Sequence, residues 1–231
     1  MNISTGISYY DEILQGSDEW LKLRMGVVTA SEVSKLITPT GKLASGKKVA
    51  LYANEIAAQQ IVSHLEDGYQ SFDMLRGHIQ EDIAREIYSD NYEKASECGF
   101  ITNDNYGVTI GCSPDGLIGS DGGIEIKSRL AKFQVETIIN NEVPSEYMIQ
   151  VQTCLLVTER DWWDFIQYSN GMPLFVQRVY PDAKMHETIV SAILNLKTQV
   201  DGVVAEYIEK SKAFIETEYV EIITDEISES E

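Results

Sequence analysis

The stretch SPDGLIGSDGGIEIKS, residues 113–128, constrains the fold more than any other part of the chain. Within it, Glu125 and Lys127 alternate with Ile124 and Ile126. Because successive side chains of a strand point to opposite faces, the two charged groups share one face and the two isoleucines share the other. The sequence therefore predicts a short apolar strand that holds a carboxylate and an ammonium side by side.

A second carboxylate, Asp115, lies ten positions upstream in a tight turn. If residues 106–117 and 122–128 form a hairpin, Asp115 lies beside Glu125. Two neighbouring carboxylates repel each other unless a cation lies between them, and Mg²⁺ prefers such oxygen ligands. A metal held there would polarise a phosphate and lower the pKa of a bound water, while Lys127 could orient the nucleophile or neutralise developing charge. This pattern is the PD-(D/E)xK nuclease signature; the alternative is a solvent-facing ion pair on an amphipathic edge strand.

The remaining apolar periodicity predicts helices first, then strands, then both interleaved. In the helix predicted over 73–88, Leu75, Ile79, Ile83 and Ile87 recur every four residues. Thr29–Glu32 fits a capping box that would start a helix through Leu36. The predicted helices cover residues 18–24, 49–65, 73–88, 130–140, 145–158 and 184–213, and the predicted strands cover 98–102, 106–112, 122–128, 162–168 and 173–180.

This order predicts an α/β (α+β) fold with a mixed central β-sheet flanked by helices. The 231 residues are enough for one sizeable core, so we expect a single domain over 1–215 and an acidic tail over 216–231. No apolar run approaches the ~18 residues that span a bilayer, and no signal peptide is visible. We therefore expect a cytoplasmic protein, in a bacterium or a phage-infected host, with no membrane partner.

The formal net charge of −19 argues at first against a nucleic-acid partner, because phosphate binders usually carry a basic face. The last sixteen residues hold seven acids and no base, and they read as a solvated terminus. A local basic groove can coexist with an acidic exterior, and a metal site needs buried acids. A non-catalytic DNA mimic or interaction protein remains an alternative.

Three other patterns carry no metal or nucleotide chemistry. Cys98, Cys112 and Cys154 are odd in number and widely spaced, which is typical of reduced thiols and disfavours a four-cysteine iron–sulfur cluster. The loop GKLASGKK, residues 41–48, ends in lysine where a phosphate-binding loop needs Ser or Thr, so it reads as a solvated or DNA-touching loop. His64, His78 and His186 lack ligand spacing.

Four blocks of the chain resemble the lambda exonuclease, or YqaJ-type viral recombinase, family within the PD-(D/E)xK superfamily. The first block together with the last makes this resemblance specific, and the blocks reach from Trp20 to Thr158. They are WLKLRMGVVTASEV (20–33), RGHIQEDIARE (76–86), the pair GCSPDGL (111–117) and GIEIKS (123–128), and EYMIQVQ with LLVT close behind (146–158).

The resemblance implies a metal site built from four groups. Asp115 and Glu125 match the family's metal-binding acids, and the carbonyl of Ile126 matches its main-chain ligand. Glu81 matches the helix glutamate of the G-x-x-x-E element, and Lys127 matches the catalytic lysine. The expected cofactor is Mg²⁺, with Mn²⁺ as an alternative and two ions per site. Taken without the resemblance, Glu81 could equally be an exposed helix glutamate.

The resemblance also implies a substrate site. Arg24 resembles the family's 5′-phosphate ligand, with Thr29 and Ser31 close by, and Tyr147 is expected on the DNA-binding side. Gln150 matches the family's helix glutamine, which would order water or phosphate at the catalytic site. The alternatives are a capping box, a surface arginine and a core glutamine with satisfied hydrogen bonds.

As a whole, the resemblance implies a Mg²⁺-dependent exonuclease that degrades one strand of linear double-stranded DNA 5′ to 3′, from 5′-phosphorylated ends, to mononucleotides. It further implies a ring-shaped homotrimer, a single-strand annealing protein as partner, and a role in phage-type recombination. An endonuclease or an iron–sulfur nuclease on the same fold is the nearest alternative.

Overall fold

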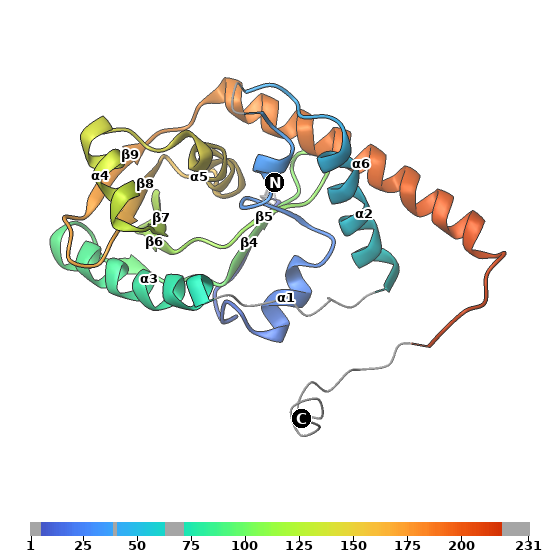
Figure 1. Ribbon diagram of the computed structural model, residues 1–231, viewed down its shortest axis with the longest axis horizontal. Coiled ribbons are helices and arrows are strands. Elements are labelled where there is room, and N and C mark those ends of the chain that lie inside the picture. The colour runs from blue at the N-terminus through green and yellow to red at the C-terminus, as the bar shows by residue number, and fades with distance from the viewer. Residues whose placement is uncertain (1–5, 39–40, 63–71, 219–231) are drawn as a thin grey trace, which may run out of the picture.

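The computed structural model describes residues 6–38, 41–62 and 72–218, and its strands form two sheets (Figure 1). The α/β class is confirmed, but the strands divide between two sheets where the sequence predicts one central sheet. The helices are α1 (Asp18–Arg24), the 3-10 turn η1 (Val33–Lys35), α2 (Lys47–Val62), α3 (Phe72–Asn91), α4 (Ala131–Asn140), α5 (Ser145–Thr158) and α6 (Ala183–Ser211). The strands are β1 (Ile7–Tyr10), β2 (Val28–Thr29), β3 (Ala95–Ser96), β4 (Phe100–Asn103), β5 (Ile110–Cys112), β6 (Gly116–Ile118), β7 (Gly122–Ser128), β8 (Trp162–Tyr168) and β9 (Phe175–Val179).

The larger sheet has the order β3-β6-β7-β8-β9, and its inner strands β6, β7 and β8 are buried on both faces over most of their length. Strands β7 and β8 are parallel, and helices α4 and α5 form the crossover between them, as a parallel pair requires. Ile124 and Ile126 pack on one face against Ala84 and Tyr88 of α3. Glu125 pairs across the sheet with Phe165, whose ring belongs to the other face, under α5. The alternation read from the sequence is therefore confirmed.

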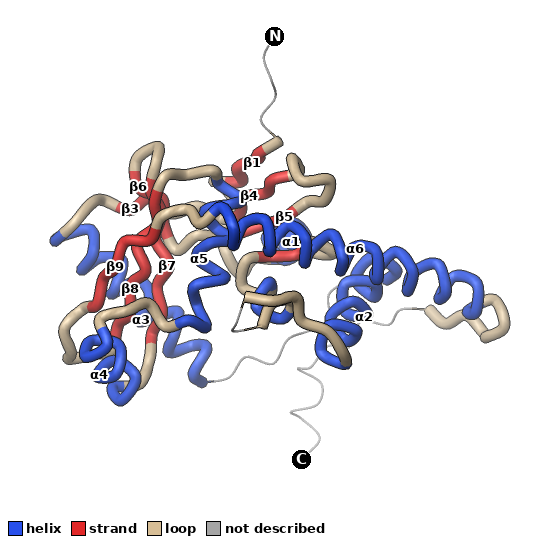
Figure 2. Tube along the Cα trace, turned by 90° about the horizontal axis from the view of Figure 1, so that it is seen from above, coloured by secondary structure: helices blue, strands red, loops and turns tan. Residues whose placement is uncertain are grey.

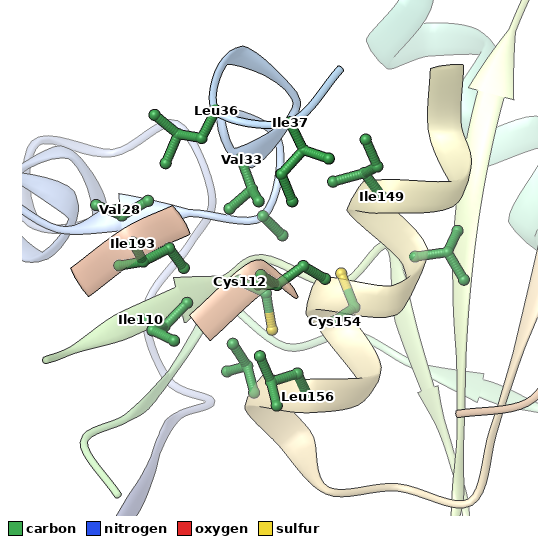
Figure 3. Close-up of a cluster of buried hydrophobic side chains, with 14 of the residues drawn as sticks. Val28, Val33, Leu36, Ile37, Ile110, Cys112, Ile149, Cys154, Leu156 and Ile193 are labelled. Carbon is green, nitrogen blue, oxygen red and sulfur yellow. The ribbon is translucent and has the colours of Figure 1, made fainter. Parts of the chain in front are cut away.

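The smaller sheet, in the order β1-β4-β5-β2, shares its core with η1, α2, α5 and α6. Helix α5 packs on strands of both sheets, which explains why almost all of its residues are buried. Figure 3 shows Ile149 and Cys154 of α5 meeting Val33, Cys112 of β5 and Ile193 of α6. In Figure 2, α6 runs beside α2 and away from the larger sheet.

The chain crosses from one sheet to the other between Cys112, the end of β5, and Gly116, the start of β6. The predicted hairpin over 106–117 and 122–128 is thus formed by β6 and β7 alone. Its register pairs Gly116 with Ile124, which places the preceding residue, Asp115, next to Glu125. The crossover therefore puts one carboxylate at the boundary of the two sheets.

The predicted capping box at Thr29–Glu32 is wrong. Thr29 pairs with Gly111 as the end of β2, and only the short turn η1 follows. Glu32 makes no side-chain capping bond and instead forms an ion pair with Lys35. Strand pairing, which local sequence does not encode, has replaced the helix start.

The buried face of α3 also differs from the predicted stripe. Ile79 and Ile83 are 58% and 41% exposed, whereas Ala84 and Tyr88 are fully buried. The small Ala84 lets the helix approach Ile124 and Ile126 of the sheet, which a row of isoleucines would hold away. The side chain of Leu75 lies outside the described residues, as do residues 63–65 of the helix predicted over 49–65 and residues 219–231 of the tail.

The residues that helix α4 buries are polar, and most of its apolar residues are exposed. Gln134 and Thr137 are its buried residues, while Val135, Ile138 and Ile139 are exposed. The Gln134 amide donates to the carbonyls of Gln167, at 3.0 Å, and of Pro173, at 2.8 Å. Hydrogen bonds to the end of β8 and the loop after it therefore hold this helix.

Within the part of the chain that the structure describes, no helix combines the length and hydropathy that a membrane span needs.

Candidate active site

Strands β6 and β7 bring together the acids and the lysine that the sequence singles out. Glu125 is 1% exposed, and its Oε1 lies 2.6 Å from Lys127 Nζ. The backbone N–H of Ile126 donates to Asp115 Oδ2 at 2.5 Å, which fixes the second carboxylate beside the first. Because β7 lies inside the sheet and Glu125 is buried, the alternative of a solvent-facing pair on an edge strand is wrong.

Helix α3 adds a third carboxylate. The Glu81 carboxyl acts on that of Asp115, because its charge adds to burial in raising the pKa of Asp115. It also pairs with Arg85, whose NH2 lies 3.2 Å from Glu81 Oε1 and whose Nε donates to the Asp115 carbonyl at 2.6 Å. Glu81 is therefore part of the cluster and not an exposed helix glutamate. Arg85 was missed by the sequence reasoning, although it lies one turn after Glu81 in the R-G-H-I-Q-E-D-I-A-R-E block.

Helix α5 contributes an amide to the same cluster. Gln150 Nε2 donates to Glu125 Oε1 at 2.6 Å, so this oxygen receives hydrogen bonds from both an amide and an ammonium. The second oxygen, Glu125 Oε2, is buried and has no partner. A buried carboxylate oxygen without a partner is costly, and it is the kind of atom that a cation would satisfy.

The electrostatics of the cluster favour an additional positive charge. Burial raises the pKa of Asp115 to about 7, and the charge of Glu81 adds to the effect. Burial likewise raises the pKa of Glu125 to about 7, and Asp115 adds to it against the opposing effect of Lys127. For Lys127, burial lowers the pKa, but Glu125 and Asp115 outweigh it and the pKa is raised. Near neutral pH these two carboxyls are therefore only partly ionised, and added cationic charge would favour their ionised forms.

The donor set fits a divalent metal by its chemistry: it offers oxygen ligands only, one of them is the unpartnered Glu125 Oε2, and the main-chain carbonyl of Ile126 follows directly after Glu125. Among the residues that the structure describes, no three Asp, Glu, His or Cys side chains converge in metal-ligand geometry. Instead, Glu125 is paired with Lys127 and Glu81 is paired with Arg85. The fit therefore rests on the donor chemistry and on the unpartnered oxygen.

A second group of polar side chains surrounds Arg24. Its guanidinium donates to Ser113 Oγ at 3.2 Å and to Thr29 Oγ1 at 3.4 Å, and Thr29 lies 3.3 Å from Ser31. The ring of Trp20 packs 4.1 Å from the Arg24 guanidinium carbon. The structure thus brings Arg24, Thr29 and Ser31 together, as predicted, in a basic cluster rich in hydroxyls.

Two members of this Arg24 cluster were missed by the sequence reasoning. Trp20 Nε1 donates to Ser113 Oγ at 2.9 Å, so the two side chains support each other and Arg24. Ser113 lies two residues before Asp115, a distance of at most about 7 Å along the chain. A signal for both is present in the sequence, because Trp20 opens the first of the four blocks and Ser113 directly precedes Pro114-Asp115.

Tyr147 does not lie in the Arg24 cluster. Its ring stacks on Phe165 with 5.5 Å between centroids, and Lys127 Nζ lies 5.6 Å from the ring centre. Arg129 donates to its hydroxyl. Tyr147 therefore borders Lys127, on the larger sheet.

Among the described residues, the three cysteines and His186 make no hydrogen bond or ion pair to the cluster's side chains. Cys98, Cys112 and Cys154 are buried and free. The pKa of the Cys154 thiol is raised, first by its hydrogen bond with Cys112 and then by burial. His186 lies at the start of α6, while His64 and the side chain of His78 lie outside the described residues.

Comparison with known proteins agrees with this geometry. The family model described as "YqaJ-like viral recombinase domain" matches residues 19–161. The alkaline exonuclease LHK-Exo from Laribacter hongkongensis is 27% identical, with a TM-score of 0.70 over 84% of this chain and 99% of that chain. Its complex with dAMP gives 28% identity and a TM-score of 0.71 over the same shares.

A phage-related exonuclease from Haemophilus somnus 129PT shares 13% identity, with a TM-score of 0.57 over 78% of this chain and 96% of that chain. At this identity the likeness shows the fold alone. No curated protein matches the sequence.

Proposed function

Because this chain belongs to the YqaJ-like viral recombinase family, we propose that it is a metal-dependent 5′-to-3′ exonuclease that degrades one strand of linear double-stranded DNA. One observation carries the proposal: three carboxylates and Lys127 gather around the buried side chain of Glu125, whose Oε2 has no partner. The likeness to alkaline exonuclease LHK-Exo supports exonuclease chemistry in particular.

The ligands of the metal would be the side chains of Asp115, Glu125 and Glu81 with the carbonyl of Ile126, and Mg²⁺ suits such an oxygen set better than a softer ion. When bound, the ion would polarise the scissile phosphate and lower the pKa of the attacking water. Mn²⁺ could replace it, and two ions per site would fit a phosphodiester cleavage.

The chain's own side chains have separate tasks around that centre. Lys127, kept charged by Glu125 and Asp115, would hold the attacking water in place and neutralise charge on the phosphate. Gln150 fixes the orientation of Glu125 by its hydrogen bond to Oε1. Arg85 holds both Glu81 and the backbone of Asp115.

The Arg24 cluster would bind the 5′-phosphate of the DNA end. A guanidinium with three hydroxyls nearby is suited to a phosphate, because it offers charge and several hydrogen-bond donors. Binding of the end at Ser113 would place the first phosphodiester bond at Asp115 and so release one nucleotide at a time. The complex of LHK-Exo with dAMP agrees with a nucleoside monophosphate product.

The wider setting is also proposed. Three chains would form a ring around the DNA with basic residues toward the channel, which would reconcile a net charge of −19 with DNA binding. A single-strand annealing protein would take over the strand that remains, as in phage-type recombination.

The test is digestion of linear duplex DNA labelled at one 5′ or one 3′ end, with and without Mg²⁺, sampled over time. We expect Mg²⁺-dependent release of mononucleotides from the 5′ end, faster with a 5′-phosphate than with a 5′-hydroxyl. Arg24→Ala should remove most of this preference.

Cleavage of a covalently closed circular plasmid would instead identify an endonuclease. DNA-independent binding to a protein, with no nuclease activity in any metal, would favour the DNA-mimic alternative.

A further inference from the structure

Arg129 continues the row of charged side chains that begins at Glu125. Residues 125, 127 and 129 are two positions apart, so their side chains lie on the same face of an extended chain. The backbone N–H of Arg129 donates to the Tyr168 carbonyl at 2.9 Å, so the pairing with β8 extends to this residue. Two residues of extended chain separate neighbours on a face by roughly 7 Å. A second cation therefore stands one step beyond the catalytic lysine, in a fixed position.

The aromatic surroundings hold the Arg129 guanidinium in place. It lies 4.3 Å from the centre of the Phe133 ring and 5.5 Å from that of Tyr147, to whose hydroxyl it donates. The Tyr147 ring is also 5.6 Å from Lys127 Nζ, so one ring separates the two cations. A guanidinium held between aromatic faces is pre-organised and needs little ordering when an anion binds.

The surroundings of Arg129 favour an anion in two further ways. Helix α4 begins two residues after it, and α5 begins beside its partners Glu146 and Tyr147; neither Leu130 nor Pro144, the two N-cap residues, caps its helix with a side chain. Helix starts carry free N–H groups and partial positive charge.

The carboxylate that neutralises the Arg129 guanidinium, that of Glu146, is easily displaced. Glu146 Oε1 lies 3.1 Å from Arg129 NH1, and the Glu146 side chain is 58% exposed. An exposed ion pair of this kind contributes little to stability, because water solvates the freed carboxylate well. A phosphate could therefore replace Glu146 at small cost.

We infer that Arg129 binds the phosphate immediately 3′ to the scissile one, on the strand being degraded, and that Glu146 occupies the guanidinium when DNA is absent. The inference rests on the proposed function. The Arg24 cluster gathers the end of α1, Thr29 of the smaller sheet and Ser113 at the start of the crossover. Asp115 lies at the end of this crossover, and Arg129 follows β7 of the larger sheet. A strand held by its 5′ end at Arg24 and crossing the carboxylates reaches Lys127 and then Arg129.

The direct test is a duplex with one uncharged methylphosphonate linkage. Placed immediately 3′ to the first scissile phosphate, it should weaken binding of the wild-type protein about tenfold in the presence of EDTA, measured by fluorescence anisotropy. Placed ten nucleotides further on, it should have a much smaller effect. In Arg129→Ala, the first substitution should cause no additional loss.

Salt dependence gives a second readout. Arg129→Ala should bind unmodified DNA about tenfold more weakly and reduce the slope of log K against log salt by about 1, as expected for one lost phosphate contact. Arg129→Lys should recover part of the affinity. Glu146→Gln should bind more tightly than wild type. Lys197→Ala, at an exposed residue of α6, is the matched control for loss of one positive charge.

The outcomes separate this inference from the proposed function. If wild-type protein neither binds nor cleaves duplex DNA, the proposed function fails. If it does both, but the methylphosphonate next to the scissile bond weakens Arg129→Ala as much as wild type, Arg129 does not bind that phosphate. Unchanged affinity in Arg129→Ala, with a melting temperature like that of wild type, would also overturn the inference.

Discussion

At the scale of single residues, the two carboxylate oxygens of Glu125 have opposite surroundings. Oε1 accepts hydrogen bonds from the Lys127 ammonium and the Gln150 amide, while Oε2 is buried and has no partner. A buried carboxylate is retained in this state only at a cost in stability. The cost is understandable where the unpartnered oxygen is reserved for a ligand.

Lys127→Ala should abolish nearly all cleavage and leave DNA binding almost unchanged. The ammonium contacts Glu125 inside the cluster, so its loss removes charge stabilisation at the reacting phosphate, an effect of at least about 10² in rate. Single-turnover cleavage and anisotropy binding in EDTA separate the two quantities. A variant that loses binding and cleavage together would contradict the assigned role.

The raised pKa values of Asp115 and Glu125 predict an unusual pH dependence of stability. Both carboxyls have pKa values of about 7 in the folded chain, against 3.8 and 4.5 as ordinary values, so the folded state binds more protons than the unfolded state between these limits. Stability from these groups is therefore present below about pH 4 and is lost as the pH rises toward 7. Between pH 5 and 8, the melting temperature of the metal-free wild-type protein should therefore fall by several degrees more than that of Glu125→Gln. A change of 1 kcal/mol in the free energy of unfolding corresponds to roughly 2–4 °C for a chain of this size.

Added Mg²⁺ should raise the wild-type melting temperature more at pH 8 than at pH 5.5, because metal and protons compete for the same oxygens. Differential scanning calorimetry with and without EDTA measures both effects. Equal pH profiles for wild type and Glu125→Gln would show that Glu125 titrates normally.

At the scale of secondary-structure elements, α3 is the element that most needs an anchor, since it presents Glu81 to strands of the larger sheet. The anchor is polar: Tyr88 donates to buried Asp164 Oδ2 at 2.6 Å, and Arg178 donates to both oxygens of the same carboxylate at 2.9 Å. Tyr88 lies seven residues, about two turns, after Glu81. The network thus fixes the helix, and through it the third carboxylate.

Tyr88→Phe should lower stability by about 1–3 kcal/mol, because it leaves a buried carboxylate with one hydrogen bond fewer. It should also raise the Mg²⁺ concentration needed for half-maximal cleavage, since Glu81 is held less firmly. Tyr92→Phe, at an exposed tyrosine that stacks on Tyr88, is the control. Equal denaturation midpoints for the two variants would contradict the anchoring role.

The sequence predicts elements well where periodicity and length agree, as in α1, α5, β7 and β8, whose observed bounds match the predicted ones. It fails where tertiary contacts decide. Thr29 joins a strand because β5 offers backbone partners, and α3 turns Ala84 inward because the sheet must come close. The four-residue β1 has too little pattern of its own to be recognised.

The candidate site follows the same division. Strand alternation alone predicts that Glu125 and Lys127 share a face, whereas only the family resemblance implies that Gln150 lies at the catalytic site. Arg85 and Arg129 could not be assigned from sequence, because their roles come from contacts with Asp115 and Tyr147, which are distant in the chain. Charged residues on helices and at strand ends are common, and only packing distinguishes the functional ones.

At the scale of the whole molecule, the net charge of −19 makes assembly the question that most affects DNA binding. If three chains form a ring, light scattering at micromolar concentration should report three times the 25.9 kDa of a single chain. A single-chain mass over the same range, from protein that digests linear duplex, would exclude the ring while keeping the nuclease.

The inverted helix α4 has a consequence for how the fold comes apart. The side-chain amides of Gln134 and Gln167 bond this helix to the end of β8 and the loop after it. Its apolar residues Val135, Ile138 and Ile139 are already exposed to solvent in the folded state. Local unfolding of α4 therefore exposes little additional apolar surface. We expect α4 to open before α5 in native-state hydrogen exchange. Gln134→Leu replaces a buried polar side chain by an apolar one, yet it should lower the protection of α4 from hydrogen exchange, because it removes both hydrogen bonds.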